Sequence, residues 1–306
     1  MGLINEVKFS DLYITPDKTC YIWSGKTDCG LMTITFDDFP EFLAGLETEY
    51  DGKNCSYLLN YKGRNYRVER TVALQGPQYC ARKMPTTVPD LKDLGIDAGV
   101  YKHLVSLSGA YGLILLAGAT GSGKSTTVSA LLKEYLSLKG GYAFTIEDPI
   151  EMPLDGEYHS QDGELGLCKQ TVPPEGKWEE GLKSALRSKP RYILLGEIRT
   201  PEVASEALRA ATSGHLVLST IHANNVSDAV NSLVKYAASS GISEEMAYDL
   251  VANGFLACIH QILEGVPKRA KQTYLFANPN TQKSCQVRGI LRSGKLNLCL
   301  LYTSDA

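Results

Sequence analysis

The sequence predicts an α/β protein of two domains, the second of which contains a parallel β-sheet with helices on both faces. Each crossover between parallel strands usually contains a helix, so alternating strand and helix patterns are typical of such a sheet. The region before this alternation contains short strands and turns, and predicts a small α+β domain. The alternating elements are apolar, strand-like runs at 112–117, 142–146, 192–195 and 216–221, and helix-like segments at 126–138, 178–188 and 202–212.

The N-terminal part is expected to contain a β-hairpin. Residues 57–61 and 65–74 show partial alternation of polar and apolar positions, and Lys62 and Gly63 between them favour a turn. The following segment, Met84–Asp90, carries two prolines that disfavour regular structure and indicate a linker. We therefore place the domain boundary near Gly99, which gives expected domains of residues 1–98 and 99–306.

Length and composition are those of an ordinary globular protein. The chain has 306 residues, of which 43% are hydrophobic, and its formal net charge is −3. Nucleic-acid binding usually shows as a basic domain or stripe, neither of which is evident, so no nucleic-acid partner is expected. No apolar run approaches the roughly 20 residues that a bilayer span needs, and the first residues lack a signal-peptide core, so we expect a cytoplasmic location.

Three further features carry no catalytic prediction. The cysteines, Cys29 and Cys299 among them, form no C-x-x-C pair, so we expect reduced thiols and no zinc site. The segment 155–177 contains four glycines and two prolines, and is expected to be an irregular excursion that includes a hairpin. The end of the chain, 300–306, has no clear pattern, and we derive no function from it.

The most informative motif lies between the first predicted strand of the second domain and the helix that follows. Residues 118–125 read Gly-Ala-Thr-Gly-Ser-Gly-Lys-Ser, which matches the phosphate-binding pattern G-x-x-x-x-G-K-S. Lys124 is expected to reach the β- and γ-phosphates of a nucleoside triphosphate, and the Ser125 hydroxyl to bind Mg²⁺. The residues expected to surround the phosphates are Gly118, Ala119, Thr120, Gly121, Ser122, Gly123, Lys124, Ser125 and Thr126.

The ends of the other predicted strands carry ionisable groups, and ligands of open α/β sheets bind at the carboxyl ends of the strands. Glu197 follows the apolar run 192–195, as an acid does in a Walker B element, where it holds Mg²⁺ or orients water. Glu147 and Asp148 end another strand and have a similar role, although Asp148 before Pro149 is also a suitable helix cap. His222 ends the fourth strand and is a candidate sensor of the γ-phosphate.

These residues resemble the secretion-superfamily ATPases that power type IV pili, type II secretion and related type IV machines. Four blocks occur in the order expected of that family, and the similarity extends over most of the chain to about residue 263. Retraction-type (PilT-like) and Dot/Icm or conjugative-transfer members are the nearer match, because the chain lacks the four-cysteine insert of assembly-type members. The blocks are 118–127, 145–151, 194–199 and 213–222.

The resemblance implies a homohexameric ring whose protomers combine a PAS-like N-terminal domain with a RecA-like P-loop NTPase domain, using ATP and Mg²⁺. It implies that Glu147 and Glu197 act as water-orienting and metal-associated acids, and that His222 senses the γ-phosphate. Arginine fingers, which supply positive charge to the γ-phosphate from another domain or subunit, are implied at Arg67, Arg82 and Arg187. The expected partner is an inner-membrane platform protein, on which the cytoplasmic ring would dock peripherally without a membrane span of its own.

Two alternatives stay open at this point. One is a nucleotide-gated structural ring with little hydrolysis, which would require a missing catalytic acid. The other is a nucleic-acid translocase on the same type of core. The sequence also departs from the family in places, since Arg191 stands where many relatives carry an acid and Thr200-Pro201 replaces a common aspartate.

Overall fold

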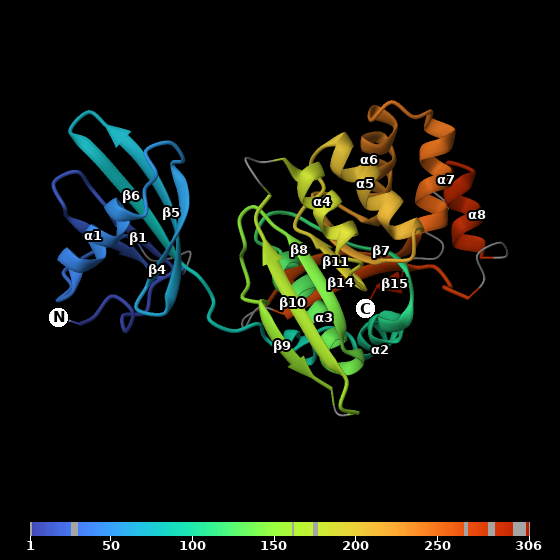
Figure 1. The fold of residues 1–306 in the computed structure, drawn as a ribbon, viewed down its shortest axis with the longest axis horizontal. Helices are drawn as coiled ribbons and strands as arrows, with labels where there is room; N and C mark the ends of the chain where they lie inside the picture. The colour runs from blue at the N-terminus through green and yellow to red at the C-terminus, as the bar shows by residue number, and fades with distance from the viewer. Residues whose placement is uncertain are drawn as a thin grey trace. The chain divides into compact units, whose positions relative to one another are not determined.

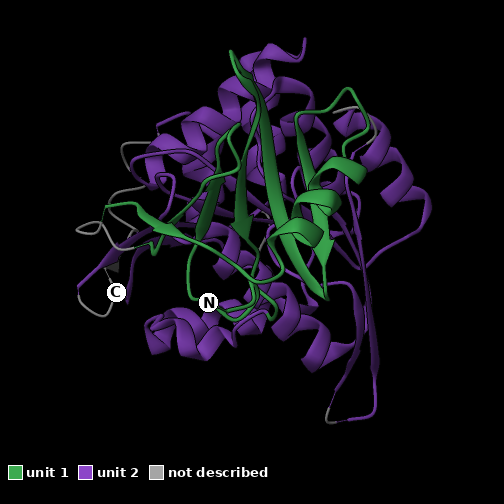
Figure 2. Cartoon of the chain, turned by 90° about the vertical axis from the view of Figure 1, so that its left-hand side faces the viewer, with its two compact units in different colours: residues 1–87 green, residues 88–306 purple. Residues whose placement is uncertain are grey.

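The protein is described by a computed structural model that covers residues 2–25, 30–160, 162–173, 177–265, 269–280, 285–295 and 304–305. Cys29 and Cys299 lie outside these residues, as does most of the segment 300–306. The chain divides into two compact units, residues 1–87 and 88–306 (Figure 2). The division precedes the expected boundary near Gly99, because Val88 and Leu91 are buried in the same core as Val100 of the second unit.

The first unit is an antiparallel six-stranded sheet with one helix, α1 (Phe39–Thr48), packed on it. Phe42 of α1 is fully buried, and its ring meets those of Tyr61 and Tyr66 edge-on at centroid distances of 5.0 and 5.1 Å. Lys62 and Gly63 have φ values of 49° and 78°, which fit the tight turn expected between β4 and β5. The strands, in the order β3-β2-β1-β6-β5-β4, are β1 (Asp11–Ile14), β2 (Cys20–Trp23), β3 (Met32–Ile34), β4 (Ser56–Tyr61), β5 (Arg64–Ala73) and β6 (Gly76–Lys83).

The second unit contains a sheet in the order β15-β14-β13-β7-β12-β11-β8-β10-β9 (Figure 1). The six strands from β13 to β10 run parallel, and an antiparallel hairpin closes each side. The strands are β7 (Gly112–Ala117), β8 (Gly141–Ile146), β9 (Gly156–His159), β10 (Leu165–Thr171), β11 (Tyr192–Leu195), β12 (Leu216–Ile221), β13 (Phe255–Glu264), β14 (Arg269–Phe276) and β15 (Ser304–Asp305).

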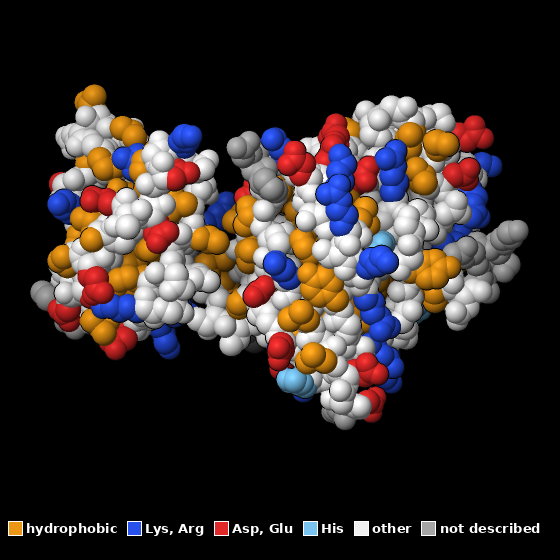
Figure 3. Space-filling view, in the orientation of Figure 1, with side chains coloured by type: hydrophobic (Ala, Val, Ile, Leu, Met, Phe, Trp, Pro, Cys, Tyr) orange, Lys and Arg blue, Asp and Glu red, His pale blue; other side chains and the backbone are white. Residues whose placement is uncertain are grey.

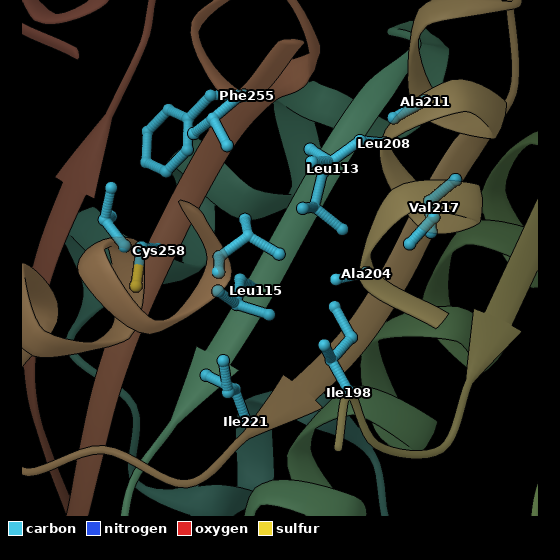
Figure 4. Packing of buried hydrophobic residues seen from close by; sticks show 14 of the residues in the cluster. Leu113, Leu115, Ile198, Ala204, Leu208, Ala211, Val217, Ile221, Phe255 and Cys258 are labelled. Atoms are coloured by element: carbon cyan, nitrogen blue, oxygen red, sulfur yellow. The ribbon is translucent and has the colours of Figure 1, made fainter. Parts of the chain in front are cut away.

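Helices cover both faces of this sheet, as the sequence predicts. One face packs against α4 to α8, and Figure 4 shows Leu113, Leu115 and Val217 pointing into this core beside Leu208 and Phe255. The other face packs against α2 and α3 together with the two short 3-10 helices η1 (Leu91–Leu94) and η2 (Leu107–Gly109). The α-helices are α2 (Ala98–Ser106), α3 (Lys124–Lys139), α4 (Trp178–Arg187), α5 (Pro201–Thr212), α6 (Val226–Ser239), α7 (Glu244–Gly254) and α8 (Gln286–Arg292).

The expected strands and helices of the second unit are all present, with boundaries that differ by a few residues at most. The hairpin expected within 155–177 is also confirmed, but its second strand, β10, joins the central sheet parallel to β8. The departure at Thr200-Pro201 has a local explanation, because Thr200 caps α5 and Pro201 occupies its first turn. No helix follows Pro149 directly, so Asp148 caps nothing there. Within the described residues, no helix combines the length and the apolar character needed to cross a bilayer.

Candidate nucleotide-binding site

The loop between β7 and α3 has the backbone shape that the phosphate-binding motif requires. Gly118, Gly121 and Gly123 have φ values of 151°, 78° and 83°, a region that favours glycine. A Cβ atom on Gly118 would lie 2.5 Å from the carbonyl oxygen of Gln261 and 2.6 Å from the Ser122 hydroxyl oxygen. The start of the loop therefore has no room for a side chain, and the backbone itself lines the cradle.

Lys124, the first residue of α3, is buried beneath this loop. Its Nζ atom donates hydrogen bonds to the carbonyl oxygens of Gly118 at 2.8 Å and Ala119 at 2.9 Å. Burial lowers the pKa of the ammonium group, and the negative charges of Glu197 and Glu151 oppose that shift. The lysine thus lies within the electrostatic field of both carboxylates, although Glu151 was not predicted as a site residue.

Strand register brings the other predicted site residues to the same edge of the sheet. Ile221 pairs with Ala117, so His222 follows next to the start of the phosphate loop. Leu195 pairs with Ile146, which places Gly196 and Glu197 beside Glu147. The amide of Gly196 also donates to the Ile146 carbonyl oxygen at 2.9 Å. Four strands therefore deliver the loop, two acids and a histidine to one place.

The Glu197 side chain is 12% exposed, and contacts with neighbouring residues fix its position. The amide of the next residue, Ile198, donates to the Thr220 carbonyl oxygen of β12 at 2.9 Å. Arg199 donates to Oε2, and Nε2 of His222 lies 2.9 Å from Oε1. Oε1 is buried and accepts no hydrogen bond from the residues that the structure describes. An acceptor oxygen in this state is ready to bind a cation or a water molecule.

Glu147 is more deeply buried than Glu197, and burial raises the pKa of its carboxyl group. Its Oε1 atom accepts a hydrogen bond from the Gln170 side-chain amide at 2.9 Å, and its backbone amide donates to the Thr171 carbonyl oxygen at 3.0 Å. Both partners belong to β10, the strand that the sequence placed in an irregular excursion. The orientation of Glu147 therefore depends on this hairpin, and Gln170 carried no signal in the sequence.

The raised pKa of Glu147 predicts a pH-dependent change in stability when the residue is replaced by glutamine. A carboxyl group whose pKa is higher in the folded protein favours folding while it is protonated, and this advantage is lost as the pH rises through the folded-state pKa. We expect Glu147→Gln to raise the melting temperature at neutral pH, with a gain that shrinks as the solution is acidified. Thermal unfolding followed at several pH values measures this, and a constant difference would contradict it.

The residues present fit a nucleotide and Mg²⁺. The glycine cradle suits a phosphate group, and Oε1 of Glu197, which accepts no hydrogen bond from the described residues, suits a cation. The half-buried Ser125 lies in the first turn of the adjoining helix. Among the described residues, no three His, Cys, Asp or Glu side chains converge as a metal site.

Two residues of the second unit are not brought to this edge, the candidate arginine finger Arg187 and His215, which belongs to the block 213–222. Arg187 ends α4, and His215 at the start of β12 lies 2.7 Å from the Pro190 carbonyl oxygen, so both lie at the opposite ends of the strands from the phosphate loop. Arg67 and Arg82 belong to the first unit, where they pair across β5 and β6. There, Arg82 donates to the buried carboxylate of Asp11 at 2.7 Å.

Lys and Arg side chains also gather on the face of the second unit that carries α4 and α5 (Figure 3). Lys183 and Arg187 of α4 and Arg209 of α5 are exposed, and Arg209 pairs with Glu206 at 2.8 Å. Lys183 lies 3.9 Å from Glu179 of the same helix, so acidic side chains accompany these cations, and the absence of a nucleic-acid partner stays a prediction.

Comparison with known proteins identifies the family. The family model described as "Type II/IV secretion system protein" matches residues 54–298, which is most of the chain. The chain belongs to this family. The resemblance inferred from the four sequence blocks is thereby confirmed.

Relatives and solved structures agree with this assignment. The chain is 31% identical over 240 residues to the twitching motility protein of Neisseria gonorrhoeae, covering 75% of this chain and 62% of that protein. It is 28% identical to the type IV pilus ATPase PilU of Pseudomonas aeruginosa, covering 61% of this chain and 47% of that protein. The chain thus spans less than two thirds of the length of these relatives.

Two solved structures share the fold. The pilus retraction motor PilT with bound ADP has a TM-score of 0.77 at 23% identity, covering 97% of this chain and 86% of that one. The Legionella pneumophila ATPase DotB has a TM-score of 0.74, covering 97% and 85%. This likeness confirms the predicted fold class, a RecA-like core preceded by a smaller α+β unit.

Proposed function

We propose that the protein is a Mg²⁺-dependent ATPase motor that works as a homohexameric ring in a type IV pilus of the retraction type, or in a related secretion or conjugation machine. The observation that carries the proposal is the strand register, which brings Glu147, Glu197 and His222 to the phosphate loop that Lys124 contacts. Membership of the type II/IV secretion system family adds independent support.

In this proposal the residues of the site divide the work of phosphoryl transfer. The loop amides and Lys124 bind the β- and γ-phosphates, so that the terminal phosphoryl group is fixed next to Glu197 and Glu147. Mg²⁺, held through Ser125 and Glu197, would neutralise developing charge on the phosphates. Glu147 orients the attacking water, because its own orientation is fixed by Gln170. His222, in contact with Glu197, faces the γ-phosphate and responds to its loss.

The ring assembly is proposed because the candidate finger Arg187 lies at the opposite end of the strands from the phosphate loop of its own unit. Within a RecA-like ring it would therefore reach the site of another subunit. Arg67 and Arg82 would serve from the first unit. The force produced would act on an inner-membrane platform protein, with the ring cytoplasmic and bound to the membrane through that partner.

Measurement of ATP turnover by the purified protein, together with sedimentation velocity, tests this proposal. We expect Mg²⁺-dependent release of phosphate and a nucleotide-stabilised hexamer. Nucleotide binding without turnover would instead favour a nucleotide-gated structural ring. Strong stimulation by DNA would favour a translocase, for which the basic grouping on α4 and α5 is the supporting observation. A protein that remains monomeric and inactive at every nucleotide concentration would contradict all three.

A further inference from the structure

Gln261 lies beside the phosphate loop but belongs to none of its motifs. Its neighbour His260 pairs with Ala117 at the end of β7, so Gln261 follows next to Gly118. Only 1% of Gln261 is exposed. Its Nε2 atom donates a hydrogen bond to the carbonyl oxygen of Ser122 at 2.7 Å, and a Cβ atom on Gly123 would lie 3.0 Å from the same nitrogen. The side chain thus contacts the end of the loop, while its backbone carbonyl contacts the start.

The orientation of this amide is fixed by two donors. Oε1 of Gln261 accepts hydrogen bonds from the Thr127 hydroxyl at 3.0 Å and from the Gln272 side-chain amide at 2.8 Å. A flipped amide would place Oε1 against the Ser122 carbonyl oxygen, two acceptors with no hydrogen between them, so Nε2 must face Ser122. Gln272 is itself buried, and within the described part of the chain its own Oε1 accepts no hydrogen bond.

The hydrogen bond to Ser122 determines where a neighbouring donor points. In a planar trans peptide the carbonyl oxygen and the following N–H group point in opposite directions. Because the Ser122 carbonyl oxygen faces Gln261, the N–H group of Gly123 faces away from β13 and toward the inside of the loop. This N–H group is one of those expected to bind phosphate at the start of α3.

We propose that Gln261 is a positioning residue of the nucleotide site, which holds the Ser122–Gly123 peptide in its phosphate-binding orientation. Thr127 and Gln272 keep the Gln261 amide correctly turned. This inference rests on the proposed nucleotide binding. It means that residues of β13 and β14, Gln261 and Gln272, help to determine the affinity for nucleotide. It also predicts that loss of Gln261 affects binding more than the chemical step.

The substitution Gln261→Glu tests this role. A carboxylate can still accept hydrogen bonds from Thr127 and Gln272, but it has no hydrogen to donate to Ser122. At about pH 8 we expect ADP affinity, measured with a fluorescent analogue, to fall about tenfold or more, and the KM for ATP to rise by more than kcat falls. A buried carboxyl group has a raised pKa, so near pH 6 it becomes protonated and can again donate to Ser122. The affinity of the variant relative to the original protein should then recover.

The matched control is Gln286→Glu, which makes the same change at an exposed position at the start of α8 and should leave affinity unchanged at both pH values. If the original protein binds no nucleotide, the proposed function fails. If it binds, and Gln261→Glu either binds equally well or is weakened by the same factor at both pH values, the positioning role is wrong. Should Gln261→Glu not fold, Thr127→Val removes one of the two orienting donors, and an unchanged ADP affinity in that variant would equally overturn the inference.

Discussion

The Lys124→Ala variant is expected to lose ATP turnover by about 10²- to 10³-fold while it remains folded. The ammonium group is the charge that the site offers to the β- and γ-phosphates, and removal of a single such donor typically costs about 10²- to 10³-fold in rate. Affinity should fall too, because Lys124 binds the phosphates in the ground state as well. Phosphate release and nucleotide titration measure the two effects separately.

The control for this variant is Lys139→Ala, which removes an exposed lysine at the other end of the same helix. Circular dichroism and thermal unfolding should show that both variants fold, since the Gly118 and Ala119 carbonyl groups bound by Lys124 lie beside the exposed part of the loop, where water can replace the ammonium. Turnover within about twofold of the original protein would exclude this phosphate loop as the place of hydrolysis.

The second large effect is expected for Glu197→Gln. Glutamine keeps the size of the side chain but removes the negative charge that would hold Mg²⁺ and polarise water. We expect turnover to fall by about 10²- to 10³-fold, whereas binding of nucleotide is largely retained. The ion pair with Arg199 is also lost, but that arginine is exposed and is easily solvated.

Glu202→Gln is the control for Glu197→Gln. Glu202 is an exposed acid in the first turn of α5, shortly after Glu197 in the chain. Its replacement should leave both turnover and binding unchanged. If Glu197→Gln hydrolysed ATP at the original rate, the catalytic acid would have to be sought at Glu147 instead.

The motif, the strands next to it and the family resemblance could be predicted from the sequence because their signals are local. Residues 112–117 are fully buried, so the whole strand is apolar, and the glycines that follow are required by their backbone conformations. The adjacent acids stood out because a charge directly after a buried strand is unusual.

The remaining parts of the site depend on pairings between distant segments, which no local pattern encodes. Gln170 reaches Glu147 only because β10 pairs with β8, and Gln261 reaches Ser122 only because β13 pairs with β7. A glutamine in a half-polar strand looks the same whether it faces solvent or a buried acid. The chain divides before Val88 and not near Gly99 for a related reason, since burial of Val88 and Leu91 depends on helices that follow them.

The two hairpins that flank the parallel strands each contribute a primary amide, from Gln170 on one side and Gln261 on the other. Primary amides neither gain nor lose a proton in the physiological range, and they add no net charge. The two amides can therefore orient the Glu147 carboxylate and the Ser122–Gly123 peptide without changing the net charge around a bound phosphate group. Acidification or alkalinisation of the solution would leave the charge and the hydrogen bonding of these two amides unaltered.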